Sequence, residues 1–268
     1  FTGFFHVFLW QRSLRRVIFQ EEDMNLIFDL DDTLYDMMQP FVRACHTIWE
    51  APLPFDPWAL FIRSRRISDQ LYPLIAQGKM SVDEVGTARI LQAAQELGED
   101  IGEQAARRFQ QHYRRFQYEA QLSDEMRALL DELSRSPLTI GILTNGPADH
   151  QRRKIEGLGL TRWFAEDHIF ISGVIGMQKP DPRAFLHVQQ ALGLDPAKTW
   201  YIGDSPSCDV KGALDAGWHM LFFNRRAHRI TMHPDITISD EHTLIDWIRK
   251  AAVLRLKWSL CQGQNSDS

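Results

Sequence analysis

Short apolar runs that end in polar residues recur along most of the chain. Residues 25–30 read Asn-Leu-Ile-Phe-Asp-Leu, a pattern typical of a buried parallel strand that opens onto a polar loop. Similar apolar runs predict strands over residues 138–143, 169–172, 199–202 and 219–223. Each run is short enough for a strand and is bounded by residues that favour turns.

Amphipathic stretches separate these runs. Apolar residues at helical spacing predict helices over residues 124–133, 148–158, 183–192 and 210–216. Strands that alternate with helices indicate an α/β fold. We therefore expect a Rossmann-like parallel sheet core with helices on both faces.

A long segment without a strand pattern interrupts this alternation between about Asp36 and Leu122. Ser81 and Glu84 have the spacing of a capping box, and apolar residues from 90 to 97 then recur at helical intervals. An all-helical insertion is the expectation. The predicted organisation is an extension (1–22), a discontinuous core (23–36 and 123–250), the insertion (37–122) and a C-terminal tail (251–268).

Composition and charge exclude several classes of protein. Of the 268 residues, 44% are hydrophobic and 24% charged, which is ordinary for a folded domain. The formal net charge of −5 provides no global positive field for a nucleic acid polymer or an anionic membrane. Cys45, Cys208 and Cys261 lie far apart, without a zinc or secreted-disulfide spacing, and this favours a reducing cytoplasm.

The two ends of the chain carry weaker patterns. The apolar run over residues 4–10 is too short to span a bilayer, and arginines follow it instead of preceding it. An extension outside the fold, disordered or artificial, is favoured over a packed segment or a targeting signal. Residues 244–258 predict a helix whose first half closes the core, with membrane-surface binding by its basic remainder as a weaker alternative, and residues 262–268 are expected to be disordered.

Polar residues follow several of the predicted strands and should meet in space, because the carboxyl ends of parallel strands share one edge of the sheet. These residues are Asp29, Asp31, Thr144, Asn145, Lys179, Asp204 and Asp209. Any one of them could be a turn residue, a helix cap or a solvated charge. Clustered carboxylates without His or Cys favour Mg²⁺, while a lysine, a hydroxyl and backbone amides suit phosphate. Together they predict a phosphoryl-transfer site.

Two further groups in the insertion allow a functional and a structural interpretation. Aromatic residues between His112 and Tyr118 could stack on a base or sugar, but packing is favoured for aromatics at helical spacing. Arg63, Arg65 and Arg66 could reach a charged leaving group, but a solvated face is favoured.

Four segments resemble the four motifs of the haloacid dehalogenase-like hydrolase superfamily, and they occur in the expected order. They are Asp29-Leu-Asp31-Asp-Thr33, Leu143-Thr144-Asn145, Lys179-Pro-Asp181-Pro and Gly203-Asp204-Ser205 followed by Asp209. The resemblance covers about residues 24 to 250 and implies a Rossmann-like core with the helical insertion as a mobile cap. The Thr144-Asn145-Gly146-Pro147 motif, the 28–35 segment and the cap position are similar to the branch of pyrimidine 5'-nucleotidases and acylneuraminate 9-phosphatases.

The resemblance also implies roles for individual residues. Asp29 would be the nucleophile that forms an aspartyl-phosphate, and Asp31 the general acid and base. Thr144, Asn145 and Lys179 would bind the phosphoryl group. Mg²⁺ would be held by Asp29, Asp204 and the backbone carbonyl of Asp31, with Asp209 in a supporting position.

The predicted activity is therefore Mg²⁺-dependent hydrolysis of a small phosphorylated metabolite, a nucleoside monophosphate or a sugar phosphate. True haloacid dehalogenases lack the second aspartate, so Asp31 favours phosphate-ester hydrolysis. A phosphomutase that uses the same intermediate is an alternative, as is a non-catalytic protein that binds a phosphorylated ligand. We expect a monomer or homodimer that binds neither a nucleic acid polymer nor a membrane.

Overall fold

A computed structural model of the chain describes residues 24–262, with side chains up to residue 252 except that of Ala76. The predictions for residues 1–22, for most of residues 262–268 and for the basic remainder of the C-terminal helix lie outside what is described.

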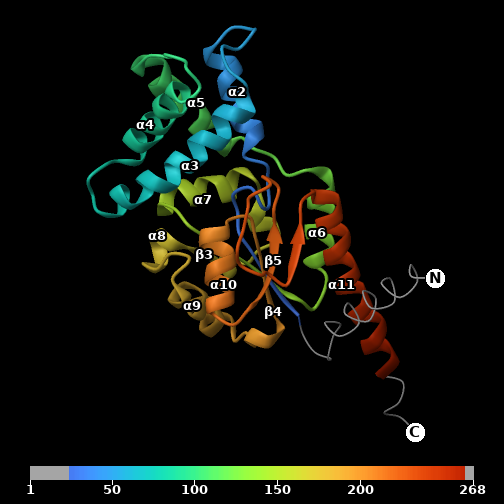
Figure 1. The fold of residues 1–268 in the computed structure, drawn as a ribbon. Coiled ribbons are helices and arrows are strands. Elements are labelled where there is room, and N and C mark those ends of the chain that lie inside the picture. Colours follow the sequence, from blue (N-terminus) through green and yellow to red (C-terminus); the bar gives the residue numbers. More distant parts are fainter. Residues whose placement is uncertain (1–23, 263–268) are drawn as a thin grey trace, which may run out of the picture.

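The core is one sheet of six parallel strands (Figure 1). The strands are β1 (Asn25–Phe28), β2 (Thr139–Thr144), β3 (Ile169–Ile171), β4 (Thr199–Gly203), β5 (His219–Phe223) and β6 (Ile236–Ile238). Their order is β3-β2-β1-β4-β5-β6, and Phe28 is in register with Ile142 on β2 and with Ile202 on β4. Because the order reverses at β1, the carboxyl ends of β1 and β4 open a crevice at the point where ligands bind in such sheets.

Both faces of the sheet are buried, as near-continuous apolar strands predict. Successive residues of β1 alternate between two hydrophobic clusters: Leu26 and Phe28 belong to one, and Ile27 to the other. Helices α6 (Asp124–Leu133) and α11 (Glu241–Gln262) contribute to the first cluster, and α9 (Pro182–Leu192) and α10 (Lys211–Asp215) to the second. The predicted Rossmann-like core with helices on both faces is confirmed.

Shorter elements complete the connections of the core. These are α7 (Ala148–Gly157), α8 (Ser172–Ile175), the 3₁₀ turns Leu160–Arg162, Glu166–His168 and Pro196–Lys198, and a π-helical turn at Pro206–Val210. The first turn of α7 follows β2 directly, so this helix begins beside the carboxyl ends of the strands.

Four helices between β1 and α6 form a separate group beyond the carboxyl ends of the strands (Figure 1). They are α2 (Met38–Ile48), α3 (Pro57–Ala76), α4 (Val82–Gln95) and α5 (Glu103–Tyr118). Ser81 accepts from the amide of Glu84, whose carboxylate accepts from the amide of Ser81, so the predicted capping box is present. Phe41 of α2 packs edge-on against Phe61 of α3 and Phe109 of α5, which joins three of the helices through aromatic contacts.

The edge strand β6 was not predicted from the sequence. It has only three residues, and Ile236 and Thr237 are not fully buried, so its apolar pattern is too short to distinguish a strand from a loop. Its position depends on the tertiary structure: Phe223 is in register with Ile238, and the carboxylate of Asp235 accepts from the amide of Met220, 2.8 Å away.

The C-terminal helix α11 closes the core as predicted, because Leu244, Ile245 and Ile248 in its first half are buried. Cys45 is a buried free cysteine and Cys208 a partly buried one. Within residues 24–262, no helix combines the length and the apolar character that crossing a membrane requires.

The contact between His219 and Asp235 should make the stability of the β5–β6 edge depend on pH. The carboxylate of Asp235, 3.3 Å from His219 Nδ1, raises the pKa of His219 above 6.5. Burial would raise the pKa of Asp235, but His219 lowers it below 3.8. The ion pair therefore makes its full contribution to stability between pH 3.8 and pH 6.5, the ordinary pKa values of Asp235 and His219. This contribution is lost as the pH rises through the raised pKa of His219.

We expect Asp235→Asn to lower the free energy of unfolding by up to about 1 kcal/mol near pH 5.5 and by less near pH 8.5. The effect is small because the two side chains are 37% and 30% exposed and solvent screens their attraction. Urea unfolding at the two pH values measures the difference. An equal loss at both values would contradict the expected role of the charged histidine.

Candidate active site

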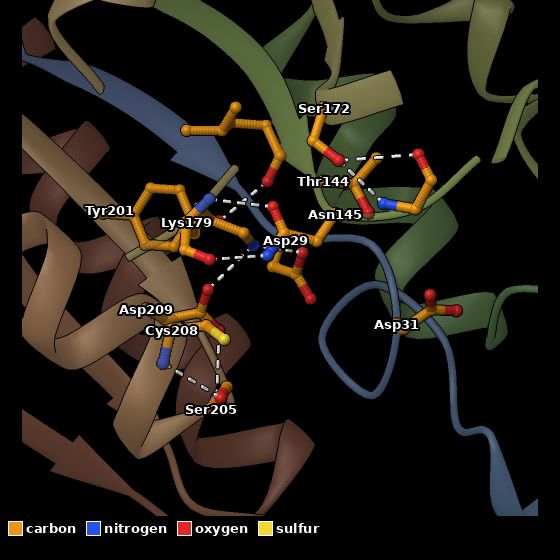
Figure 2. A network of polar contacts seen from close by, with 12 residues as sticks. Asp29, Asp31, Thr144, Asn145, Ser172, Lys179, Tyr201, Ser205, Cys208 and Asp209 are labelled. Carbon is orange, nitrogen blue, oxygen red and sulfur yellow. Dashed lines mark hydrogen bonds and ion pairs between the residues drawn. The ribbon is translucent and has the colours of Figure 1, made fainter. Parts of the chain in front are cut away.

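The predicted site residues all line one cavity of about 630 Å³ at the carboxyl ends of the strands. Asp29 follows β1, Thr144 ends β2, and Asp204 follows β4, so the crevice at the strand-order reversal is where they meet. Figure 2 shows side chains from these separate elements gathered around Lys179. Helices α3, α4 and α5 line the same cavity from the other side.

Lys179 lies at the centre of the site and is only 3% exposed. Its Nζ is 2.6 Å from Asp29 Oδ1, 2.7 Å from Asp209 Oδ1 and 2.6 Å from the hydroxyl oxygen of Tyr201. Tyr201 donates its own proton to the carbonyl of Leu143, so it accepts from the ammonium. Burial alone would lower the pKa of Lys179, but the carboxylates of Asp209 and Asp29 raise it well above 10.5. The side chain is therefore a permanent positive charge at the end of β1.

Asn145 holds the backbone of Lys179 in place. Its Nδ2 donates to the carbonyl of Lys179 over 2.8 Å, and its Oδ1 accepts from the amide of Lys179 over 2.9 Å. Both polar ends of the side chain are thus used within the protein. In the structure the side chain positions the lysine, and the predicted binding of phosphate by Asn145 stays a prediction.

Thr144 keeps a hydroxyl proton available to a ligand. Its Oγ1 accepts from Gln151 Nε2 at 2.6 Å, and the side chain is almost fully buried at the cavity wall. A hydroxyl that already accepts one bond can still donate one. Thr144 can therefore donate to an oxygen of a bound phosphoryl group.

Three carboxylates form a possible cation site. Oxygens of Asp29, Asp204 and Asp209 all lie within 4.8 Å of one another. Burial and the neighbouring carboxylates raise the pKa of Asp29 to about 7, although Lys179 opposes the rise, and they raise the pKa of Asp204 well above 3.8. A bound cation would favour the ionised forms, and an all-oxygen donor set suits Mg²⁺. The residues present therefore fit the predicted ion.

The acid cluster contains one carboxylate more than the two, of Asp29 and Asp204, that were predicted to bind the metal. Asp209, predicted as supporting, contributes its carboxylate to the cluster, whereas the carboxylate of Asp31 lies apart from it (Figure 2). The proposed ligand of Asp31 is its backbone carbonyl, and that role stays a prediction.

Asp31 is bound instead by a lysine that the sequence did not single out. Nζ of Lys154 lies 2.8 Å and 2.6 Å from the two carboxylate oxygens, and the hydroxyl of Tyr35 donates to the same carboxylate over 2.6 Å. Burial would raise the pKa of Asp31, but Lys154 and Tyr35 lower it well below 3.8. Lys154 lies on α7 three residues after Gln151, which also faces the site. Helical spacing alone does not separate such a buried lysine from a solvated one.

A sequence model of the haloacid dehalogenase-like hydrolases matches residues 24–217. The Bacillus subtilis protein YfnB, named a HAD-hydrolase, is 32% identical over 205 residues, which are 75% of this chain and 83% of YfnB. A crystal structure of YfnB, described as bound to magnesium and as revealing interdomain movement, has a TM-score of 0.64 at 28% identity. That match covers 84% of this chain and 97% of the solved one.

Proteins named as phosphatases are also among the similar proteins. The phosphoserine phosphatase of Thermus thermophilus is 38% identical over 121 residues, so the match spans 44% of this chain and only 48% of that enzyme. The N-acylneuraminate-9-phosphatase of Mus musculus is 33% identical over 41% of this chain and 44% of its own. Pyrimidine 5'-nucleotidase PynA of Streptococcus pneumoniae is 26% identical over 84% of this chain and 94% of its own. The last two names confirm the branch indicated by the motifs.

Solved L-2-haloacid dehalogenases share the architecture as well. The enzyme RSc1362 has a TM-score of 0.67 over 85% of this chain, with 18% sequence identity. At that identity the likeness concerns the fold alone.

Replacing Lys154 should destabilise the protein strongly. The side chain is 2% exposed and pairs with a carboxylate that is 20% exposed, so Lys154→Met leaves a largely buried charge without its partner. We expect a loss of about 3 kcal/mol in the free energy of unfolding, measured by urea denaturation. Lys211→Met is the matched control, because Lys211 pairs with Asp215 on the surface of α10 and is 54% exposed; its loss should stay below about 0.5 kcal/mol. Equal losses would contradict a structural role for the buried pair.

Proposed function

The chain belongs to the haloacid dehalogenase-like hydrolase family, and on this premise we propose that it is a Mg²⁺-dependent phosphatase of small phosphorylated metabolites. Nucleoside monophosphates and sugar phosphates are the proposed substrate classes. The observation that carries the proposal is the pair Asp29 and Asp31 in one cavity with Lys179 and Thr144. A nucleophile, an acid–base group and two phosphate ligands are the parts that this reaction requires. The named phosphatase and nucleotidase relatives support it.

In the first step, Asp29 attacks the phosphorus atom of the substrate. A bond forms between a carboxylate oxygen of Asp29 and phosphorus as the bond to the alcohol oxygen breaks, which leaves an aspartyl-phosphate. Lys179 lies 2.6 Å from Asp29, so its ammonium favours the ionised nucleophile and can balance charge on the phosphoryl oxygens. The Thr144 hydroxyl is placed to donate to another of these oxygens.

Asp31 moves the proton in both steps. It gives a proton to the departing alcohol oxygen and later takes one from the water that hydrolyses the aspartyl-phosphate. Its pairing with Lys154 holds Asp31 ionised in the structure, which suits the second step. The negative phosphoryl group of the substrate raises the pKa of nearby carboxylates and so promotes the protonation that the first step needs.

Asp29, Asp204 and Asp209 would hold the magnesium ion, as the fit of their oxygens suggests. When bound, the ion offsets the negative charge of the carboxylates and of the phosphoryl group. The description of the YfnB structure as bound to magnesium supports magnesium as the ion. It also accounts for three mutually repelling acids in one cluster, two of which, Asp29 and Asp204, have a raised pKa without a cation.

The helical insertion is proposed to be the cap that covers the reaction. Residues of α3, α4 and α5 line the cavity together with the catalytic carboxylates, so the insertion restricts access of bulk water and contacts the leaving group. The interdomain movement described for YfnB supports a cap that opens and closes. A reducing cytoplasm, favoured by the cysteine pattern, completes the proposal.

Release of inorganic phosphate tests the proposed activity and its metal dependence. We expect phosphate from a subset of nucleoside monophosphates, sugar phosphates and flavin mononucleotide in the presence of Mg²⁺. Excess EDTA should lower the rate at least roughly a hundredfold, and added Mg²⁺ should restore it, because the three carboxylates lose their counterion. Transfer of the group to a second sugar hydroxyl without free phosphate would instead indicate a phosphomutase. Full activity with EDTA would contradict the metal role.

The Asp29→Asn variant tests the nucleophile. The amide cannot form the covalent intermediate, so phosphate release should fall by at least about a thousandfold while the far-ultraviolet circular dichroism stays unchanged. Asp240→Asn is the matched control: Asp240 is an exposed cap of α11 outside the cavity, and asparagine also caps helices well. Unchanged turnover in Asp29→Asn would overturn the mechanism.

A further inference from the structure

Positively charged side chains gather on the insertion side of the cavity. Arg65 of α3, Arg89 of α4 and Arg114 of α5 line it. The proposed mechanism uses none of them, because its phosphate ligands all belong to the core. The arginines therefore form a second basic region in the same cavity.

Arg89 is buried without an acidic partner. It is 7% exposed, and no carboxylate of the described side chains lies within 4.0 Å of its guanidinium. It donates to Gln110 Oε1 over 3.1 Å, and its carbon Cζ lies 5.3 Å from the ring centre of Tyr113, but its Nε has no hydrogen-bond partner. A buried guanidinium without a counterion is unfavourable. Burial and the nearby charges of Arg65 and Arg114 lower the pKa of Arg89 to about 10.

The neighbouring arginines differ in how far their charge is already balanced. Arg63 and Arg66 lie beside Glu96 at the surface, and Arg114 pairs with Asp83. Arg65 has no ion pair among the described side chains, although Asp69 is close enough to raise its pKa. The expectation of a solvated face therefore holds for Arg63. Arg65 and Arg66 both line the cavity, but the charge of Arg66 is already paired with Glu96.

The packing of the insertion keeps Gln110 beside Arg89. A Cβ atom on Gly86 of α4 would come within 2.3 Å of Gln110 Cδ, so only glycine allows this close approach. Gln110 itself is 6% exposed and bonds to the guanidinium. The local sequence thus builds an oriented arginine at the cavity wall.

We propose that Arg89 and Arg65 bind a second anionic group on the leaving alcohol of the substrate. This inference rests on the proposed function and narrows it: the substrate is a phosphomonoester whose alcohol also carries a carboxylate or a second phosphate. Lys179 and Thr144 would take the transferred phosphoryl group, and the arginines the remaining anion. Guanidinium groups bind both anions through paired hydrogen bonds.

This arrangement would also reject neutral leaving groups. An uncharged sugar or nucleoside would leave the buried guanidinium of Arg89 without a counterion, and unpaired buried charge weakens binding. Among the proposed substrate classes, sugar phosphates with an additional acidic group are therefore favoured over nucleoside monophosphates.

Matched substrate pairs test the inference. 6-Phosphogluconate differs from sorbitol 6-phosphate by a carboxylate in place of the C1 hydroxymethyl group, and fructose 1,6-bisphosphate differs from fructose 6-phosphate by a phosphate. We expect kcat/KM to be roughly 10- to 100-fold higher for the anionic member of at least one pair, because a hydrogen-bonded charge is gained. The pair that shows the preference identifies the anion. Ratios within about threefold in both pairs would overturn the inference.

Variants assign the preference to the arginines. Arg89→Gln should reduce kcat/KM for the preferred anionic substrate at least roughly tenfold more than for its neutral partner, mainly by raising KM. Arg65→Gln, at a partly exposed position, should show the same selectivity. Thermal unfolding detects whether the buried Arg89→Gln substitution impairs folding. If it does, Arg65→Gln provides the test. Arg107→Gln is the control, because Arg107 is exposed on α5 and pairs only with Glu103 among the described side chains. Equal losses for both substrates in both variants would overturn the assignment.

A binding measurement separates this inference from the proposed activity. Isothermal titration calorimetry with gluconate and sorbitol compares an acidic and a neutral ligand that contain no phosphate ester and therefore cannot be turned over. At least tenfold tighter binding of gluconate, lost in Arg89→Gln, would support the arginine site even if p-nitrophenyl phosphate and all other phosphomonoesters release no phosphate. The absence of phosphate release from every phosphomonoester would overturn the proposed phosphatase activity but not the arginine site. Equal binding of acidic and neutral ligands would overturn the arginine site, whatever the turnover.

Discussion

The ion pairs of one buried lysine hold the candidate active site together. Asp29, Asp204 and Asp209 come from two strand ends and would repel one another at the short separation that the sheet imposes. Lys179 lies between Asp29 and Asp209 and supplies a positive charge where burial has removed water. Its own position depends on the bonds between the Asn145 side chain and its backbone, and on the bond that its ammonium donates to the hydroxyl of Tyr201. The loop that carries Lys179 therefore reduces the repulsion between these carboxylates.

Charge is divided between the two walls of the cavity. The sheet side carries the acid cluster, which suits a cation and the reacting phosphorus atom, whereas the insertion side carries Arg65 and Arg89. Helix α7 provides a third charged region of the cavity, where Lys154 holds the carboxylate of Asp31 away from the acid cluster. A substrate with two anionic groups would span these regions, with its phosphoryl group at the sheet and its second anion at the insertion.

The fold was largely predictable from the sequence because its strands are short apolar runs and its helices show regular helical spacing of apolar residues. Buried strands such as β1 are nearly continuous apolar runs, and a polar residue of the candidate site, Asp29 in the case of β1, follows directly. Parallel strands bring those ends to one edge, so residues as distant in sequence as Asp29 and Asp204 were expected to meet. The strand that was not predicted is β6. It is too short to show the periodicity of a strand, and its position depends on pairing with β5.

The sequence alone determined the fold class, the family and the residues at the strand ends, because local periodicity and motif spacing carry that information. Only the tertiary structure decided which charges face one another. Arg63 and Arg65 are two positions apart on one helix, yet one lies beside a surface glutamate and the other lines the cavity. The sequence pattern does not distinguish Lys154 from a solvated helical lysine. Only the packing of α7 buries it beside Asp31. Pairing of buried charges depends on contacts between distant segments, and residue spacing along the chain does not specify those contacts.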